Sequence, residues 1–138
     1  MSFLSRRLAR EIAFQTLFQI DLGKNDPEAS LQQRLSETAL AAGDLGYVQT
    51  VVRGVINQLP ALDAQIGAVS KGWELHRLGS VDRNILRLAV YEIVFMDDIP
   101  VGVAINEAVE LAKKFSDLQS ARFINGLLGT VAKDGGFQ

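Results

Sequence analysis

Apolar residues recur along this chain every three to four positions, which is the period of an amphipathic α-helix. The pattern is clearest where Ile12, Phe14 and Leu17 follow one another at helical spacing. No segment alternates apolar and polar residues in the way that a half-buried strand requires. The pattern predicts seven helices, in segments 5–22, 26–43, 44–60, 60–72, 80–100, 101–115 and 116–134.

Residues with strong helix-boundary preferences support these divisions. Asp26 is expected to cap the second helix with Pro27 at its first position, and Gly43 is expected to end it. Pro60 is expected to stop the third helix, and Ser80 is expected to cap the fifth. Short connections of this kind favour packing between successive helices. We therefore expect an all-α fold, a single-domain bundle of about seven helices over residues 1–138.

Composition agrees with a soluble globular protein of one domain. The chain has 138 residues, of which 48% are hydrophobic and 22% are charged. It has no cysteine, which excludes disulfides, thiolate metal sites and a cysteine nucleophile. No apolar run approaches the roughly 18 residues of a membrane span, and no signal-peptide core follows the first arginines. We expect a cytoplasmic protein.

Charge is distributed unevenly along the chain. The formal net charge is −2, but residues 1–20 hold three arginines and one acid, and residues 113–138 hold four cations and two acids. Residues 21–112 hold seven cations and thirteen acids. If the two basic ends meet in space, they form a local positive patch on an acidic body.

The stretch "LSRRLAREIAFQTLFQ" places Arg6, Arg7 and Arg10 in the opening turns of an otherwise apolar helix. Cations are slightly unfavourable at this end of a helix, so helix energetics does not explain them. One interpretation is a solvated helix end in which Arg7 pairs with Glu11. The other is an exposed basic prong whose guanidinium groups bind phosphates.

The last helix carries a phenylalanine away from its apolar face. That face is formed by Ala121, Ile124, Leu128 and Val131, whereas Phe123 points about 100° away from it, beside Gln119 and next to Arg122. The ring either packs against a neighbouring helix or forms a stacking platform for an unpaired base.

A polar stripe on the fifth helix gives a third candidate surface. Arg83, Asn84, Arg87 and Tyr91 fall within one arc of the predicted helix. The stripe is either solvated or a docking surface, because Arg and Tyr are enriched in protein interfaces.

Catalytic motifs are weak in this sequence. His76 is the single histidine, and it has no partners at triad-like spacing. Asp97 and Asp98 precede Pro100, which favours a solvated turn over a catalytic pair, and Trp73 is expected to pack against the bundle. We expect a protein that is not an enzyme and that needs no cofactor and no metal.

Four motifs resemble one bacterial family in order and spacing. They are "RRLAREIAFQTLFQID", "DRNILRLAVYEI", "IPVGVAINEAVELAKKF" and "SARFINGLLG", and they extend from residue 6 to residue 129. The sequence resembles the NusB family of transcription antitermination factors. The resemblance implies a helical bundle of two subdomains that binds the boxA element of nascent ribosomal RNA. It implies the partner NusE, a small-subunit ribosomal protein, in an antitermination complex on RNA polymerase.

The resemblance also implies roles for particular residues. RNA contacts are expected from Arg6, Arg7, Arg10, Gln119, Arg122 and Phe123. Contacts with NusE are expected from Asp82, Arg83, Arg87, Tyr91 and Glu92. The family often has an aromatic residue and a lysine at the positions of Val101 and Gly102, a histidine at Ala121 and an aspartate at Gly129.

Two other functions are compatible with the same helical module. NusB-like domains also precede the catalytic domain of ribosomal RNA cytosine methyltransferases, but with a sequence that ends at Gln138 we do not expect that arrangement here. The other is a scaffold for protein–protein contacts that no longer binds RNA.

Overall fold

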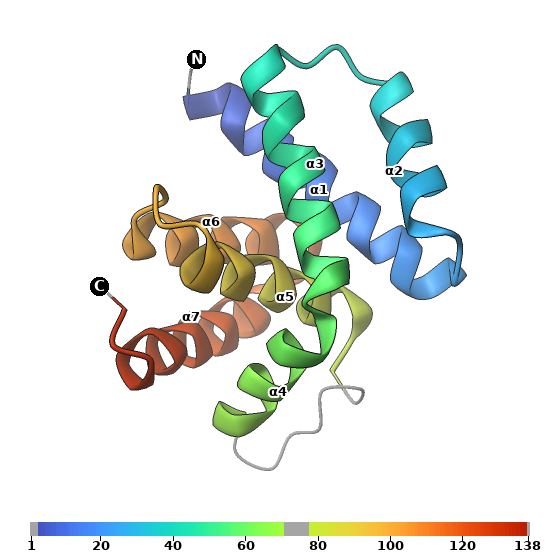
Figure 1. The fold of residues 1–138 in the computed structure, drawn as a ribbon. Coiled ribbons are helices and arrows are strands. Elements are labelled where there is room, and N and C mark those ends of the chain that lie inside the picture. The colour runs from blue at the N-terminus through green and yellow to red at the C-terminus, as the bar shows by residue number, and fades with distance from the viewer. Residues whose placement is uncertain (1–2, 71–77, 138) are drawn as a thin grey trace. The chain divides into compact units, whose positions relative to one another are not determined.

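The computed structural model describes residues 3–70 and 78–137, with side chains described from residue 5 onward. Within these ranges the chain forms seven α-helices and no strand, as the apolar pattern predicts. Trp73 and His76 lie outside the described residues. The chain divides into two compact units, residues 1–57 and residues 58–138 (Figure 1).

The first unit contains three helices. They are α1 (Phe3–Gly23), α2 (Pro27–Ser36) and α3 (Ala42–Asn57), and each contacts the other two. The apolar stripe of α1 is buried, as predicted, and so are the valines of α3. Asp26 caps α2 as predicted, because its carboxylate accepts a hydrogen bond from the Ala29 backbone N–H at 2.9 Å.

The second helix is shorter than the sequence indicates. It ends at Ser36, and Gly43 lies inside the next helix rather than at the end of this one. The hydroxyl groups of Ser36 and Thr38 donate to the carbonyl oxygens of Gln33 and Leu35. Hydroxyl groups that take up carbonyl oxygens in this way compete with continuation of the helix. The predicted end at Gly43 is therefore wrong.

The second unit contains four helices, α4 (Leu59–Val69), α5 (Ser80–Phe95), α6 (Val101–Phe115) and α7 (Leu118–Asp134). Helix α5 contacts each of the other three, and α6 and α7 pack against one another (Figure 1). The predicted apolar face of α7 is confirmed, since Ala121, Ile124, Leu128 and Val131 are all buried. Large side chains of α5, including Ile85, Leu86 and Val90, are buried as well.

The boundaries of α5 differ from the prediction at both ends. Gly79 occupies the cap position and Ser80 begins the helix, and the helix ends at Phe95 rather than continuing to residue 100. Asp97 and Asp98 are exposed in the turn that follows, as expected. Pro100 then occupies the cap position of α6, where its lack of an N–H costs nothing.

No helix in the described part of the chain combines the length and the apolar character needed to cross a lipid bilayer.

Candidate functional site

Arg6, at the end of the first turn of α1, is held by two residues of α3. Its Nε donates a hydrogen bond to Oδ1 of Asp44 at 2.9 Å, and the Asp44 side chain is 1% exposed. Its guanidinium carbon lies 4.6 Å from the centroid of the Tyr47 ring, a cation–π distance. The Arg6 side chain keeps 28% of its surface exposed. Arg6 is therefore fixed in direction and still reachable from solvent.

Arg10 does not extend into solvent. The residue is 4% exposed, and its guanidinium carbon lies 5.5 Å from the centroid of the same Tyr47 ring. The prediction of an exposed Arg10 is wrong, because α3 supplies an aromatic ring that covers this turn of α1. Arg7 is half-buried. Of the three arginines, only Arg6 and Arg7 therefore reach the solvent, whereas Arg10 is buried.

The predicted RNA-contacting residues of α7 differ in exposure. Gln119 and Arg122 are exposed, and Phe123 is half-buried. Phe123 borders two hollows of the second unit. One, of about 430 Å³, also contains Arg122 and Thr130, and the other, of about 270 Å³, contains Asp82 and Asp117. The ring therefore stands between a cationic hollow and an acidic one.

The structure brings Asp82 close to the predicted α7 segment. Ser120 of α7 donates a hydrogen bond from its hydroxyl to Oδ2 of Asp82 on α5, at 2.9 Å. Asp82 and Phe123 line the same hollow although 41 positions separate them in the sequence. The expected partner surface of α5 and the expected RNA surface of α7 consequently adjoin at this point.

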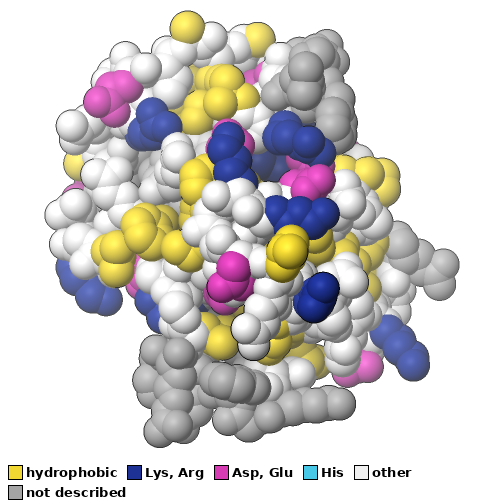
Figure 2. Space-filling model, turned by 180° about the vertical axis from the view of Figure 1, so that it is seen from behind, with side chains coloured by type: hydrophobic (Ala, Val, Ile, Leu, Met, Phe, Trp, Pro, Cys, Tyr) yellow, Lys and Arg dark blue, Asp and Glu magenta, His cyan; other side chains and the backbone are white. Residues whose placement is uncertain are grey.

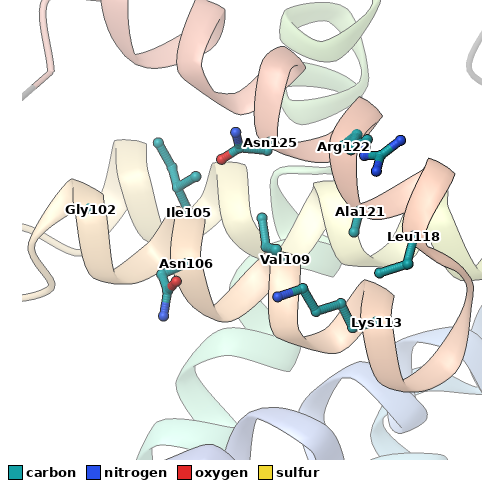
Figure 3. A pocket seen from close by; sticks show the side chains of 9 residues that line it. All are labelled: Gly102, Ile105, Asn106, Val109, Lys113, Leu118, Ala121, Arg122 and Asn125. Atoms are coloured by element: carbon teal, nitrogen blue, oxygen red, sulfur yellow. The ribbon is translucent and has the colours of Figure 1, made fainter.

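A larger hollow of about 490 Å³ lies between α6 and α7 (Figure 3). Its polar lining comes from both helices: Asn106 and Lys113 of α6, and Arg122 and Asn125 of α7. Its apolar walls are formed by Ile105, Val109 and Leu118. Gly102 lies at its edge, and a Cβ placed there would meet no atom within 4 Å. Arg122 borders both this hollow and the one beside Phe123.

The polar stripe of α5 is mostly covered. Arg87 is 8% exposed, and Asn84 and Glu92 are also buried. Arg87 binds Asp63 of α4 through two hydrogen bonds, Nε to Oδ1 at 2.8 Å and Nη2 to Oδ2 at 2.9 Å. The prediction that this arc faces solvent is wrong for Arg87 and Asn84. Asp63 of α4 supplies the counter-charge of Arg87, and the Asn84 side chain donates to the Ser80 carbonyl oxygen of its own helix. Asp82, Arg83 and Tyr91 are half-buried, and Nη1 of Arg83 donates to the Leu78 carbonyl oxygen.

An aromatic pair remains accessible at the C-terminal end of α5. The rings of Tyr91 and Phe95 stack with centroids 5.2 Å apart, and Phe95 is 43% exposed. Sequence reasoning missed Phe95, although its i,i+4 spacing from Tyr91 places the two rings on one side of the helix. It also missed Asp44, Tyr47 and Asp63, for which the sequence carries no comparable signal.

Cations do not form a continuous sheet of charge on the face drawn in Figure 2. Lys and Arg side chains stand there singly or in small groups, with acidic side chains beside them. Arg6 and Arg122 belong to different units, so the single positive patch made by both chain ends stays a prediction. Within the described residues, no group of three or more His, Cys, Asp or Glu side chains is placed to hold a metal ion.

These features define a class of protein: a small all-helical molecule whose candidate sites are cationic and aromatic side chains on helix surfaces. The model of the NusB family matches residues 7–133. The chain belongs to the NusB family.

The alignments with individual relatives cover most of this chain and most of each relative. The chain is 46% identical to the transcription antitermination protein NusB of Desulforamulus reducens over 91% of this chain and 88% of that protein. It is 44% identical to the NusB of Bacillus licheniformis, over 95% and 98%.

Solved structures agree with the fold. T. maritima NusB superposes with a TM-score of 0.88 at 38% identity, over 94% of this chain and 91% of that one. A chain from the crystal structure of antitermination factors NusB and NusE in complex with dsRNA superposes with a TM-score of 0.87 at 28% identity, over 96% and 99%.

Proposed function

We propose that this protein is a cytoplasmic transcription antitermination factor that binds the boxA element of nascent ribosomal RNA together with NusE. The pair acts in a complex on RNA polymerase. The observation that carries the proposal is the similarity, over nearly the full length of both chains, to a chain in the complex of NusB and NusE with dsRNA. The protein acts by binding and not by catalysis.

The RNA contacts that we propose come from both units: Arg6 and Arg7 of α1 in the first, and Gln119, Arg122 and Phe123 of α7 in the second. Arginine suits phosphate because its planar fork matches the geometry of the phosphate oxygens. Phe123 is half-buried and borders two hollows, and we propose that an unpaired base stacks on its ring. The buried Arg10 is proposed to support Arg6 through Tyr47 and not to touch RNA.

The NusE surface that we propose consists of Asp82, Arg83, Tyr91 and Phe95. Tyr91 and Phe95 supply a stacked apolar pair, and aromatic anchors dominate many interfaces energetically. Arg87 and Glu92 are buried, so we propose that they shape α5 from within and do not contact the partner.

The test is a titration of boxA RNA by fluorescence anisotropy, with and without NusE. We expect wild-type protein to bind boxA RNA more tightly than an RNA of the same length and scrambled sequence, and NusE to tighten that binding. Arg122→Ala is expected to weaken RNA binding. It should also make the plot of log binding constant against log salt concentration less steep by about 0.7–0.9, the value for one lost phosphate contact. Lys133→Ala, an exposed cation of the same helix outside the proposed surface, is the matched control. Equal affinity for boxA and scrambled RNA, with NusE present, would contradict the proposal.

A further inference from the structure

The guanidinium group of Arg6 is constrained on one edge and on one face. Its Nε edge is occupied by Oδ1 of Asp44, at 2.9 Å. Its plane is covered by the Tyr47 ring, whose centroid lies 4.6 Å from the guanidinium carbon. Both contacts come from the first two turns of α3, since Asp44 and Tyr47 are three positions apart. Few exposed arginines are held in this way, because a long flexible side chain loses conformational entropy when it is fixed.

The opposite edge of the same group is available. Within the described part of the chain, no hydrogen-bond acceptor contacts Nη1 or Nη2 of Arg6, and the side chain keeps 28% of its surface exposed. Two parallel N–H groups of one guanidinium match two oxygens of a phosphate group. The available edge therefore has the donors that end-on phosphate recognition requires.

Asp44 is placed so that it holds Arg6 without competing for the same edge. Its side chain is 1% exposed, and Oδ2 is buried with no hydrogen-bond partner among the described residues. A buried carboxylate without a partner is strongly unfavourable, so movement of Arg6 away from Asp44 carries a large cost. A phosphate that approaches the Nη edge meets the cation first and does not need to displace the carboxylate.

Tyr47 restrains a second cation as well. Arg10, one helical turn after Arg6, lies with its guanidinium carbon 5.5 Å from the same ring centroid. Tyr47 is 4% exposed, so its ring is fixed by its surroundings. The ring thus forms a rigid support for Arg6, with a second positive charge close to the same face of the unit.

We propose that Asp44 and Tyr47 are positioning residues for RNA binding, which hold Arg6 so that its Nη1 and Nη2 groups receive an RNA phosphate. The inference rests on the proposed RNA-binding function and adds a preorganised phosphate site in the first unit. Preorganisation increases affinity because the side-chain ordering is completed before the ligand binds. Asp44, although negatively charged, then favours the binding of a polyanion.

A double-mutant cycle tests this inference through boxA RNA affinity. We expect Arg6→Ala to weaken binding by about tenfold, and Asp44→Asn to weaken it by about three- to tenfold. Because Asp44 acts through Arg6, the double variant should bind no more weakly than Arg6→Ala alone. Each variant should also lower the salt slope by about 0.7–0.9, which a purely structural role of Asp44 would not do.

Matched variants separate positioning from charge and from folding. Glu28→Gln removes a carboxylate from another arginine pair of the same unit, that of Arg53, and is expected to leave RNA affinity unchanged. Arg6→Lys keeps the charge but has no planar fork, so it should recover little of the loss. If a thermal melt shows that Asp44→Asn does not fold, Tyr47→Leu takes its place in the cycle, because it removes the ring over Arg6 and keeps a smaller apolar side chain at this buried position.

The outcomes are distinct. Failure of the wild-type protein to bind boxA RNA, with or without NusE, would overturn the proposed function itself. Wild-type binding together with unchanged or increased affinity in a folded Asp44→Asn variant would overturn the positioning role alone. Additive losses in the double variant would also overturn it, since they would mean that Asp44 and Arg6 act independently.

Discussion

Arg87 of α5 and Asp63 of α4 form a two-point ion pair inside the second unit. The two hydrogen bonds measure 2.8 and 2.9 Å, and Arg87 is buried while Asp63 is half-buried. Nη1 of Arg87 also contacts Oδ1 of Asn84 at 3.4 Å. Such a pair fixes how two helices pack, because two N–H groups of one planar guanidinium meet the two oxygens of one carboxylate.

Removal of Asp63 is expected to destabilise the protein strongly. Asp63→Ala leaves the Arg87 cation buried without its carboxylate, and the free energy of unfolding should fall by about 2–4 kcal/mol. Chemical denaturation monitored by circular dichroism measures the change. Arg53→Gln, which removes the exposed pair with Glu28, is the control and should leave the midpoint nearly unchanged. Equal midpoints for Asp63→Ala and wild type would contradict a stabilising role for this pair.

Phe123→Ala is expected to affect RNA binding more than folding. The ring is half-buried between two hollows, so its loss removes less packing than the loss of a core phenylalanine, for which about 3–5 kcal/mol is typical. Loss of one stacked base should weaken boxA binding by about 1–3 kcal/mol. A thermal melt measures the change in stability and an RNA titration on the same preparation measures the change in affinity, and together they separate a stacking role from a core role. A large loss of stability with unchanged RNA affinity of the folded fraction would assign Phe123 to the core.

Tyr91→Ala is expected to weaken the association with NusE by more than about 1 kcal/mol. The variant loses the ring that stacks on Phe95, and with it the proposed aromatic anchor of the α5 surface. RNA binding by the protein alone should stay nearly intact, because Tyr91 is not part of the proposed RNA surface. Isothermal titration with NusE gives the measurement, and Leu22→Ala, an exposed apolar residue of α1, is the control. Unchanged NusE affinity in a Tyr91→Ala, Phe95→Ala double variant would place the interface elsewhere.

The pKa of Glu28 is expected to lie below its ordinary value of 4.5. Hydrogen bonds from Arg53 are the main cause, and one from Gln32 adds to it. A depressed pKa in the folded state means that the pair stabilises the protein above the unfolded pKa, and that this contribution is lost as the pH falls through the folded pKa. NMR titration of the Glu28 carboxyl carbon measures the shift. The pKa should rise toward 4.5 in Arg53→Gln, and a pKa that does not change would contradict the pairing in solution.

Local signals in the sequence determined the helices and several of their ends. The predicted segment 101–115 coincides with α6, and the Asp26 cap and the apolar face of α7 are present as expected. The reason is that helix period, capping and proline effects act over a few neighbouring residues, which the sequence displays directly. Family membership follows from the same kind of information, since motifs are read along the chain.

Only the tertiary structure decided which cations are exposed. In a helical projection Arg6 and Arg10 share a face with the buried Phe14, whereas Arg87 lies on the polar arc of α5. Neither position shows which distant residue covers the cation. Arg10 is buried because Tyr47 approaches from α3, and Arg87 because Asp63 approaches from α4. A cation can be buried when a distant segment supplies a ring or a carboxylate that replaces its hydration. That partner is far away in the sequence, so no local pattern reveals it, and the same holds for Asp44, which orients Arg6.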